Sequence, residues 1–542
     1  MLGGAARIRC RFRLARMSEP RVLSLPLAMP DIARAAREGG PESAWYEPAP
    51  RDAFEWRARA VSVRDSGARD WARALEPALE STGAAAERLA RVADGGLVVT
   101  TGQQPGLFGG PIYTWSKALS AIALADAIED VSGIPTVPVY WAATYDADYA
   151  EASETHAAVE DHVVTLTAPP ATVTGRGMRD TPLGDVGGAM RTLAGTAGAA
   201  AAPQIMDLVR RAYAPGRTVG GAFVTLLRAI LEPLGMPVLD AGHPAVQAAA
   251  RPALARALAD AAPVDAALRA RNAALADAGY EPQVAHVDRL SMVFAAGAGE
   301  RRRLPIGAPL DGAQGALEPN VLLRPVVERA ILPTVAYVAG PAEQAYFAQS
   351  TAVADALGMA RPLAVPRWSG VIVEPHVQRI LDRYALDVDA LRDPHAVLGR
   401  LVRERVPAEV RGAMVRYRQV LEAAAADLDA ALTRTTPPLV DHAVAEGTRR
   451  NIAHRLDRLE RRIAAATKRR ETDLVRQIGV ARASLFPLDR LQERVLNLMP
   501  LLARHGLPLI DAMAARAREH VAALGLSPAA QTAVSPHAGG GR

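Results

Sequence analysis

The pattern of apolar and polar positions changes near residue 95. Residues 30–95 follow the three-to-four spacing of helices, whereas 97–100 is a short β-branched run that predicts a strand. A Gly/Pro-rich loop at 101–111, an apolar helical segment at 112–128 and a second strand at 136–141 follow. A strand, glycine loop, helix and strand within about 45 residues are typical of a βαβ unit, which predicts a parallel sheet.

Later segments extend the same α/β pattern. Strand-like runs at 236–240, 334–338 and 371–374 would complete the sheet, and a helix pair is predicted between the first two, up to about residue 278. Apart from a short strand at 163–166, residues 151–220 show no clear periodicity, so we expect an insertion or a flexible connection there. A β-rich patch covers 283–304.

Beyond residue 393 the pattern is that of long helices. Apolar residues follow one another in alternating steps of four and three, which is a heptad seam. Because Pro437-Pro438 stops the first helix, the two helices should form an antiparallel hairpin or associate with another chain. Two ordinary core helices remain the alternative, since each seam is short. The seam residues are Val410, Met414, Tyr417, Leu421, Ala424, Leu428 and Ala431, then Ile452, Leu456, Leu459, Ile463 and Ala466.

Composition narrows the class of protein. Half of the 542 residues are apolar and 22% are charged, which indicates a globular protein and excludes disorder, collagen and a disulfide scaffold. The one cysteine, Cys10, excludes an internal disulfide and a cysteine-based metal cluster, and suits a reducing compartment such as the cytoplasm. No apolar stretch reaches the roughly 18 residues of a membrane helix, so no membrane partner is expected.

The net charge of +5 is a local feature. Residues 1–16 carry five arginines and no acid, and without them the 58 acidic residues are matched one for one by basic residues. A neutral body gives no support for a nucleic-acid partner. We expect residues 1–28 to be a disordered tail or a misassigned start, with Met17 or Met29 as the first residue.

The loop after the first strand is the strongest candidate for a ligand site. It follows the carboxyl end of a strand, where ligands bind in open α/β sheets, and precedes a helix N-terminus that favours anions. Tyr113 and Lys117 are one helical turn apart on the same face. A plain turn is the alternative, because the loop is neither a Walker A motif nor a dinucleotide fingerprint. The candidate binding residues are Thr101, Gly102, Gln103, Gln104, Gly106, Gly109 and Gly110.

Two further clusters carry polar side chains. Asp146 and Asp148 follow the second strand, where they could hold Mg²⁺ of a nucleotide, bind a substrate amine, or simply cap the next helix. Arg324 stands in an apolar run and needs a buried partner or an anionic ligand. The other members of its cluster, which suits structure or function equally, are Asn320, Tyr337, Gly340, Glu343 and Tyr346.

Four segments resemble the BshC family, the cysteine ligases of bacillithiol biosynthesis. The segments are VVTTGQQPGLFGGPIY (98–113), PVYW (138–141), PNVLLRPVVERAILPTVAYVAGPAEQAY (319–346) and LFPLDRLQERVLN (485–497). The similarity is collinear over about residues 20–525. It implies a Rossmann-like catalytic core akin to class I aminoacyl-tRNA synthetases, with connecting insertions, and a helical coiled coil that forms a homodimer.

The resemblance refines the expected domains. We place the Rossmann-like core at 29–400, with insertions at about 151–235 and 283–318, and the coiled-coil hairpin at 401–485. Residues 486–525 should form a helical segment that packs back on the core, followed by a disordered tail at 526–542. One departure stands out: where the family has Glu and His after the tryptophan, this chain has Tyr145 and Ala147, while both Asp positions are kept.

The expected reaction is ATP-dependent amide formation, with Mg²⁺, between cysteine and glucosaminyl-malate. Lys117, Asp146 and Asp148 are the candidate catalytic residues: Lys117 would offset negative charge, the two Asp would hold Mg²⁺ or the substrate ammonium, and Arg324 would clamp a carboxylate. No resident metal site is predicted. The alternative is a catalytically degraded paralogue that binds ligands or assembles as a dimer. An RNA-binding synthetase relative is disfavoured by the neutral body.

Overall fold

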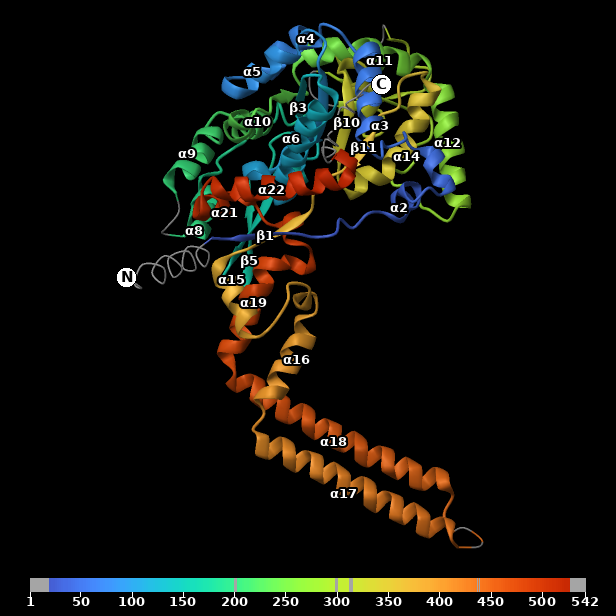
Figure 1. The fold of residues 1–542 in the computed structure, drawn as a ribbon, viewed down its shortest axis with the longest axis vertical. Coiled ribbons are helices and arrows are strands. Elements are labelled where there is room, and N and C mark those ends of the chain that lie inside the picture. Colours follow the sequence, from blue (N-terminus) through green and yellow to red (C-terminus); the bar gives the residue numbers. More distant parts are fainter. Residues whose placement is uncertain are drawn as a thin grey trace, which may run out of the picture. The chain divides into compact units, whose positions relative to one another are not determined.

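The computed structural model describes residues 19–198, 202–297, 301–310, 315–435, 437 and 439–526 (Figure 1). The chain divides into two compact units, which are described separately below. Unit 1 comprises residues 1–157, 164–372 and 491–542, and unit 2 comprises 158–163 and 373–490. The boundary that the sequence analysis placed at residue 400, between the core and the coiled-coil hairpin, therefore lies within unit 2. Cys10 and both proposed tails, apart from residues 19–28 and 526, lie outside the described residues.

A five-stranded parallel sheet forms the centre of unit 1 and confirms the predicted α/β core. Its order is β11-β10-β2-β3-β6, and every neighbouring pair is parallel. The strands are β2 (Leu97–Gln103), β3 (Thr136–Ala142), β6 (Val238–Asp240), β10 (Thr334–Ala339) and β11 (Ala364–Pro366). β2 and β3 are buried almost throughout, as expected of a sheet covered on both faces.

The run at 371–374 does not complete this sheet, so that prediction was wrong. It forms β12 (Gly370–Val373), which pairs with β1 (Arg21–Ser24) in a separate two-stranded sheet. The position next to β10 is already taken by β11, which the sequence pattern had not singled out. Residues 21–24, assigned above to the tail, are thus part of the fold.

Helices cover the sheet. α6 (Ile112–Ser132) packs against β2, β3 and β10, and it ends at Gly133, whose φ of +70° suits a residue without Cβ. On a second surface Val98, Val139 and Leu239 meet apolar side chains of α4, α11 and α13. These helices and the other helices of this region are α2 (Asp31–Arg37), α3 (Ala53–Ser66), α4 (Trp71–Leu79), α5 (Gly83–Val92), α11 (Pro244–Ala259), α12 (Ala261–Asp277), α13 (Arg324–Ile331) and α14 (Pro341–Ala356).

The described residues of the two predicted insertions form helices and strands. The stretch at 151–220, interpreted as an insertion or flexible connection, contains a β-hairpin and helices: α7 (Tyr149–Ala152), β4 (Glu154–Val159), β5 (His162–Thr167), α8 (Gly187–Ala197), α9 (Pro203–Ala212) and α10 (Val219–Leu231). The β-rich patch forms an antiparallel sheet of order β8-β7-β9, with β7 (Leu290–Ala296), β8 (Arg301–Pro305) and β9 (Ala316–Pro319).

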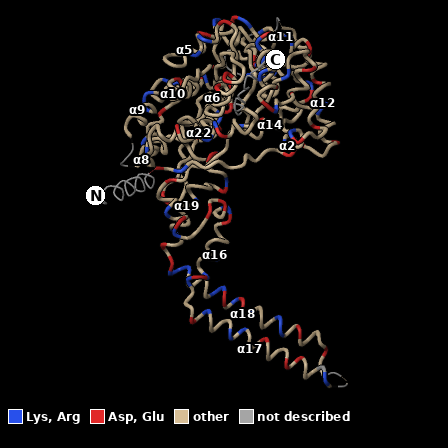
Figure 2. Tube along the Cα trace, in the orientation of Figure 1, with Lys and Arg blue, Asp and Glu red and all other residues tan. Residues whose placement is uncertain are grey.

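Unit 2 contains the predicted helical hairpin. α17 (Ala408–Thr433) and α18 (His442–Arg470) pack side by side, and Arg418 bridges them through ion pairs to Asp457 (2.8 Å) and Glu460 (3.0 Å). Basic and acidic residues are interspersed along both helices (Figure 2). The unit also holds α15 (Pro375–Arg383), α16 (Pro394–Arg405) and α19 (Thr472–Leu485).

The prediction of a heptad seam in the hairpin is only partly confirmed. Leu456 is buried, and Met414 and Leu421 are half-buried, but Tyr417 and Leu428 remain 53% and 58% exposed. Around the axis of α17, the half-buried residues are offset by about one-fifth of a turn from the line of apolar residues that the heptad pattern predicted, which we call the predicted stripe. The stripe is therefore split between the contact with α18 and a solvent-facing surface.

After unit 2 the chain returns to unit 1 at Leu491. α20 (Gln492–Val495) and α21 (Leu498–His505) lead to α22 (Pro508–Val521), which packs on α6. The side chain of Gln492 accepts the N–H of Ile372 and donates to its C=O. These bonds join the two segments of unit 1 between which unit 2 is inserted. Among the described helices, none is long and apolar enough to cross a membrane.

Candidate functional site

The sheet order places a crevice beside β2. From β2 the chain continues to β3 and β6 on one side and later to β10 and β11 on the other, so the carboxyl ends of β2 and β10 meet where the strand order reverses. Ligands bind at such a switch point in open α/β sheets. A cavity of about 500 Å³, the large cavity, opens there. Of the sequence-predicted residues it is lined by Gly102, Gln103, Gln104, Tyr113, Lys117, Asp146, Asn320, Arg324, Tyr337, Gly340, Glu343 and Tyr346.

Glu343 connects the loops that follow β2 and β10. One carboxylate oxygen lies 2.6 Å from Lys117 Nζ and accepts the Gly340 N–H at 2.6 Å, while the other accepts from the Tyr337 hydroxyl at 2.5 Å. Lys117 also donates to the carbonyl of Gly102 at 2.6 Å. The residue at the third position of α14 therefore holds the ammonium of α6 beneath the glycine loop.

The charges of this pair depend on burial. Burial lowers the pKa of Lys117, and the negative charge of Glu343 opposes that change. Burial by itself would raise the pKa of Glu343, but the positive charges of Lys117 and Arg324 hold it below its usual value. Glu343 is thus a carboxylate at neutral pH, and Lys117 is a desolvated cation next to the cavity.

Arg324 has the buried partners that its apolar surroundings require. It pairs with Glu328 at 2.9 Å, donates to the Tyr346 hydroxyl at 3.0 Å, and lies 4.7 Å from the centre of the Tyr337 ring. Asn320 accepts the N–H of Leu323 at 2.9 Å and so helps to begin α13. Both residues still line the large cavity, so their ligand roles stay predictions.

Asn497 fixes the shape of the glycine loop. Its Nδ2 lies 3.0–3.2 Å from the carbonyl oxygens of Leu107, Phe108 and Gly110. Phe108 has a φ of +51° and is followed by Gly109 and Gly110, also with positive φ. Glycine adopts this conformation freely, but Phe108 is strained in it unless tertiary contacts support the loop. Asn497 supplies this support from a segment almost 390 residues away.

The remaining predicted loop residues have separate places. The Thr101 hydroxyl donates to the carbonyl of Val338 at 2.9 Å and is buried beneath the cavity. Gly109 packs against Trp115, and its N–H donates to the Tyr213 hydroxyl. Gly106 and Gly110 line a second cavity of about 190 Å³, the small cavity, whose wall shares Gln103, Gln104, Tyr113 and Arg494 with the large one.

The two aspartates after β3 are in different environments. Asp146 lines the large cavity together with Tyr145. Asp148 is exposed and accepts the Glu151 N–H at 3.2 Å, which caps α7. The structure thus places Asp148 outside both cavities, in the capping position that the sequence left open.

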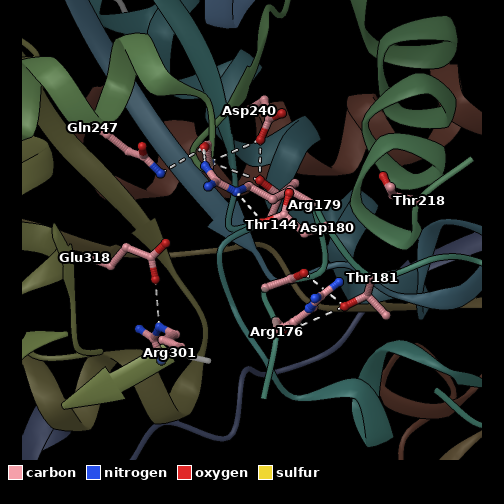
Figure 3. Close-up of polar contacts among 12 residues, drawn as sticks. Thr144, Arg176, Arg179, Asp180, Thr181, Thr218, Asp240, Gln247, Arg301 and Glu318 are labelled. Atoms are coloured by element: carbon pink, nitrogen blue, oxygen red, sulfur yellow. Dashed lines mark hydrogen bonds and ion pairs between the residues drawn. The ribbon is translucent and has the colours of Figure 1, made fainter. Parts of the chain in front are cut away.

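A loop at 176–181 forms hydrogen bonds with the segments that follow β3 and β6 (Figure 3). The Thr144 hydroxyl bonds the carboxylate of Asp240, and Arg179 donates to the carbonyl of Gly242. The backbone N–H of Arg179 also donates to the carbonyl of Thr144 at 2.8 Å. These bonds fix the backbone that precedes Tyr145 and Asp146.

Sequence reasoning missed several cationic residues of the large cavity. Arg301 lies 3.8 Å above the ring of Phe294, 5.7 Å from that of Tyr145, and pairs with Glu318 at 2.8 Å (Figure 3). Arg303, Arg367 and Arg494 also line the cavity. The run Arg301–Arg303 and the resemblance segment at 485–497 were the available signals, but neither indicates which side chains face a cavity.

Arg367 lines the large cavity and is held by a buried ion pair. Its guanidinium makes two bonds, of 2.7 and 2.8 Å, to Glu493 in the core. Its Nε is buried and has no hydrogen-bond partner within the described part of the chain. Searching the described residues for three or more His, Cys, Asp or Glu side chains able to hold a metal finds no such group.

Comparisons with known proteins agree with these features. The family model "Bacillithiol biosynthesis BshC, N-terminal Rossmann-like domain" matches residues 43–310 and 309–368, and the model of the BshC C-terminal coiled-coil domain matches 370–522. Proteins named "Putative cysteine ligase BshC" are similar over most of their length. The protein of Solibacter usitatus is 33% identical, covering 80% of this chain and 85% of its own. That of Koribacter versatilis is 32% identical, with 82% and 86% covered.

Proposed function

The chain belongs to the BshC family, and on that premise we propose that it is an ATP-dependent ligase that joins L-cysteine to glucosaminyl-malate and so completes bacillithiol. The observation that carries this proposal is the convergence of the glycine loop, Lys117 and Asp146 on one cavity of about 500 Å³ at the switch point of the sheet. Pockets of roughly 300–1,000 Å³ take ligands of nucleotide or conjugate size.

The chemistry needs two steps. First, the carboxylate oxygen of cysteine attacks a phosphorus atom of ATP, which gives a mixed anhydride and releases ADP or pyrophosphate. Then the amine nitrogen of the glucosaminyl group attacks the acyl carbon, a C–N bond forms, the C–O bond to the phosphoryl or adenylyl group breaks, and the amine proton is lost. Lys117 would stabilise the negative charge that develops on oxygen.

Magnesium would enter with the nucleotide. Mg²⁺ is commonly held by one or two carboxylates together with substrate phosphates. Asp146 is the carboxylate available for this role in the large cavity, because Glu343 is engaged by Lys117. Arg324 stays a candidate for a substrate carboxylate. Asp148 has the weaker position, since it caps α7.

The test is product formation by the full-length protein. ATP, L-cysteine and glucosaminyl-malate are incubated with it, and bacillithiol, ADP and AMP are measured by mass spectrometry. We expect bacillithiol and one nucleotide product in equal amounts, with at least a hundredfold slower turnover in Lys117→Met. A folded wild-type protein that forms no bacillithiol contradicts the proposal.

A degraded paralogue is the second candidate, favoured by one observation. Tyr145 and Ala147 replace the Glu and His of the family motif, and Tyr145 is buried beside Asp146 at the cavity wall. Such a protein would bind ATP or glucosaminyl-malate in a calorimeter and convert neither. In both cases we propose a homodimer through α17, whose exposed stripe offers Val410, Tyr417 and Leu428 to a second chain.

A further inference from the structure

The small cavity differs from the large one in size. It lies between the glycine loop, β4 and α20, and its volume of about 190 Å³ is below the roughly 300 Å³ at which pockets begin to take drug-sized ligands. A nucleotide or a sugar conjugate exceeds this space, whereas a small amino acid fits it. The two cavities are neighbours, because both are lined by Gln103, Gln104, Tyr113 and Arg494.

Arg494 provides a positive charge at this shared wall. The residues before it on α20 are anchored: Glu493 bonds Arg367 and Ser369, and Gln492 bonds the backbone of Ile372. Arg494 itself is exposed, and no carboxylate of the described residues lies within ion-pair distance of its guanidinium. A cation held by an anchored helix, facing two cavities and without an anion of its own, is suited to a ligand carboxylate.

Glu151 provides the opposite charge. It lines the small cavity but not the large one, and it accepts a hydrogen bond from Gln104 of the shared wall. Among the described residues, this carboxylate has no ion pair with a lysine or arginine. One cavity of amino-acid size is thus lined by an exposed guanidinium and an exposed carboxylate, neither of which has an ion pair among the described residues.

We propose that the small cavity is the amino-acid subsite, in which Arg494 binds the α-carboxylate and Glu151 binds the α-ammonium of L-cysteine. This inference rests on the proposed ligase function, and it adds an orientation. The carboxylate, which must be activated, lies at the wall shared with the large cavity. The ammonium, which takes no part in the reaction, is held away from the nucleotide.

Three ligands distinguish binding through the α-carboxylate from binding through the α-ammonium. L-Cysteine carries both, L-cysteinamide lacks the negative charge, and 3-mercaptopropionate lacks the positive one. Calorimetric titration of the full-length protein, with and without a non-hydrolysable ATP analogue, should show that Arg494→Gln weakens L-cysteine binding about tenfold or more and leaves L-cysteinamide binding unchanged. Glu151→Gln should weaken L-cysteine and L-cysteinamide but leave 3-mercaptopropionate unchanged.

The ligand series also controls for folding, because a misfolded variant would lose all three ligands. Arg490→Gln and Glu160→Gln are matched controls, since both residues are exposed and line neither cavity. The proposal is overturned if Arg494→Gln weakens L-cysteine and L-cysteinamide equally, or if wild-type protein binds no L-cysteine with or without the ATP analogue.

Turnover separates this inference from the proposed function. If wild-type protein shows the predicted binding pattern but forms no bacillithiol, the subsite stands and the ligase proposal fails. If it forms bacillithiol while Arg494→Gln leaves the KM for cysteine unchanged, the ligase proposal stands and the subsite is wrong. In the expected outcome, Arg494→Gln raises the KM for cysteine and leaves the KM values for ATP and glucosaminyl-malate within twofold of wild type.

Discussion

Lys117 Nζ lies 2.6 Å from a carboxylate oxygen of Glu343, and the pair joins helices α6 and α14, which are more than 200 residues apart in the sequence. Lys117 is 2% exposed, so removal of Glu343 would leave a buried charge unpaired. We expect Glu343→Gln to lower the free energy of unfolding by about 3–5 kcal/mol, the usual loss when one member of a buried pair is removed.

A double-mutant cycle checks this expectation. Lys117→Met together with Glu343→Gln should restore part of the lost stability, because no unpaired charge remains. Urea denaturation of the wild type, both single variants and the double variant gives the coupling energy. Strictly additive losses would show that the two side chains do not interact in the folded protein.

The same pair predicts a pH dependence of stability. The folded protein holds the pKa of Glu343 below its usual value, mainly because the charges of Lys117 and Arg324 outweigh the effect of burial. Its stabilising contribution is therefore present above the unfolded pKa of about 4.3 and is lost as the pH falls through the lower folded pKa. The difference in unfolding free energy between wild type and Glu343→Gln should shrink below about pH 4, which urea titrations from pH 3 to 7 would detect.

Asn497 supports the glycine loop through one amide group. Asn497→Ala would leave carbonyl oxygens of Leu107, Phe108 and Gly110 without this donor, and we expect a loss of about 1–3 kcal/mol. Limited proteolysis should then cut within residues 104–111 faster than in the wild type. Asn451→Ala, on the exposed face of α18, is the matched control. Equal cleavage rates for both variants would mean that the loop keeps its shape without Asn497.

The sequence was informative where its signal is local. A β-branched run followed by glycines and an apolar helix predicts β2, its loop and α6 correctly, because each element is determined by neighbouring residues. The rule that ligands bind at the carboxyl ends of parallel strands then predicts that Lys117, beside the glycine loop, and Asp146, after the neighbouring strand, share one crevice. The structure places both at the same cavity.

Long-range relationships were not predictable in the same way. A short strand such as β12 carries no information about its partner, so its pairing with β1 was missed. The four-three spacing on α17 fits two adjacent faces of the helix, and only packing shows which one contacts α18. Arg494 and Asn497 reach the glycine loop from the far end of the chain, and their spacing reveals nothing of that contact.

The exposed stripe of α17 predicts the oligomeric state. Tyr417→Lys combined with Leu428→Lys would place two charges in the proposed interface between chains, and we expect the dimer to dissociate to monomers. Analytical ultracentrifugation at micromolar concentration measures this change. Val415→Lys is the matched control, because Val415 is 57% exposed but points about 160° away from Tyr417 around the helix. A wild-type monomer, or a dimer that survives the double substitution, contradicts the proposed interface.

Glu151 predicts how cysteine binding depends on pH. Partial burial raises the pKa of Glu151, and the negative charges of Asp148 and Asp146 raise it further, while Lys117 opposes them. The other titratable side chains of the small cavity are Tyr113, Glu154, His156 and Arg494. An ammonium binds the carboxylate form alone, so affinity for L-cysteinamide should fall as the pH drops through a value above the ordinary glutamate pKa of about 4.3.

Calorimetry between pH 4 and 8 measures this midpoint. Glu151→Gln has no proton to gain at this position, so its weaker affinity should stay level over the range in which the wild type declines. His156→Gln separates the imidazole from the carboxylate, since a midpoint that belongs to Glu151 is kept in this variant. If Glu151→Gln and wild type lose affinity in parallel, the ammonium is bound by another group, and Asp146 in the neighbouring large cavity becomes the carboxylate to test.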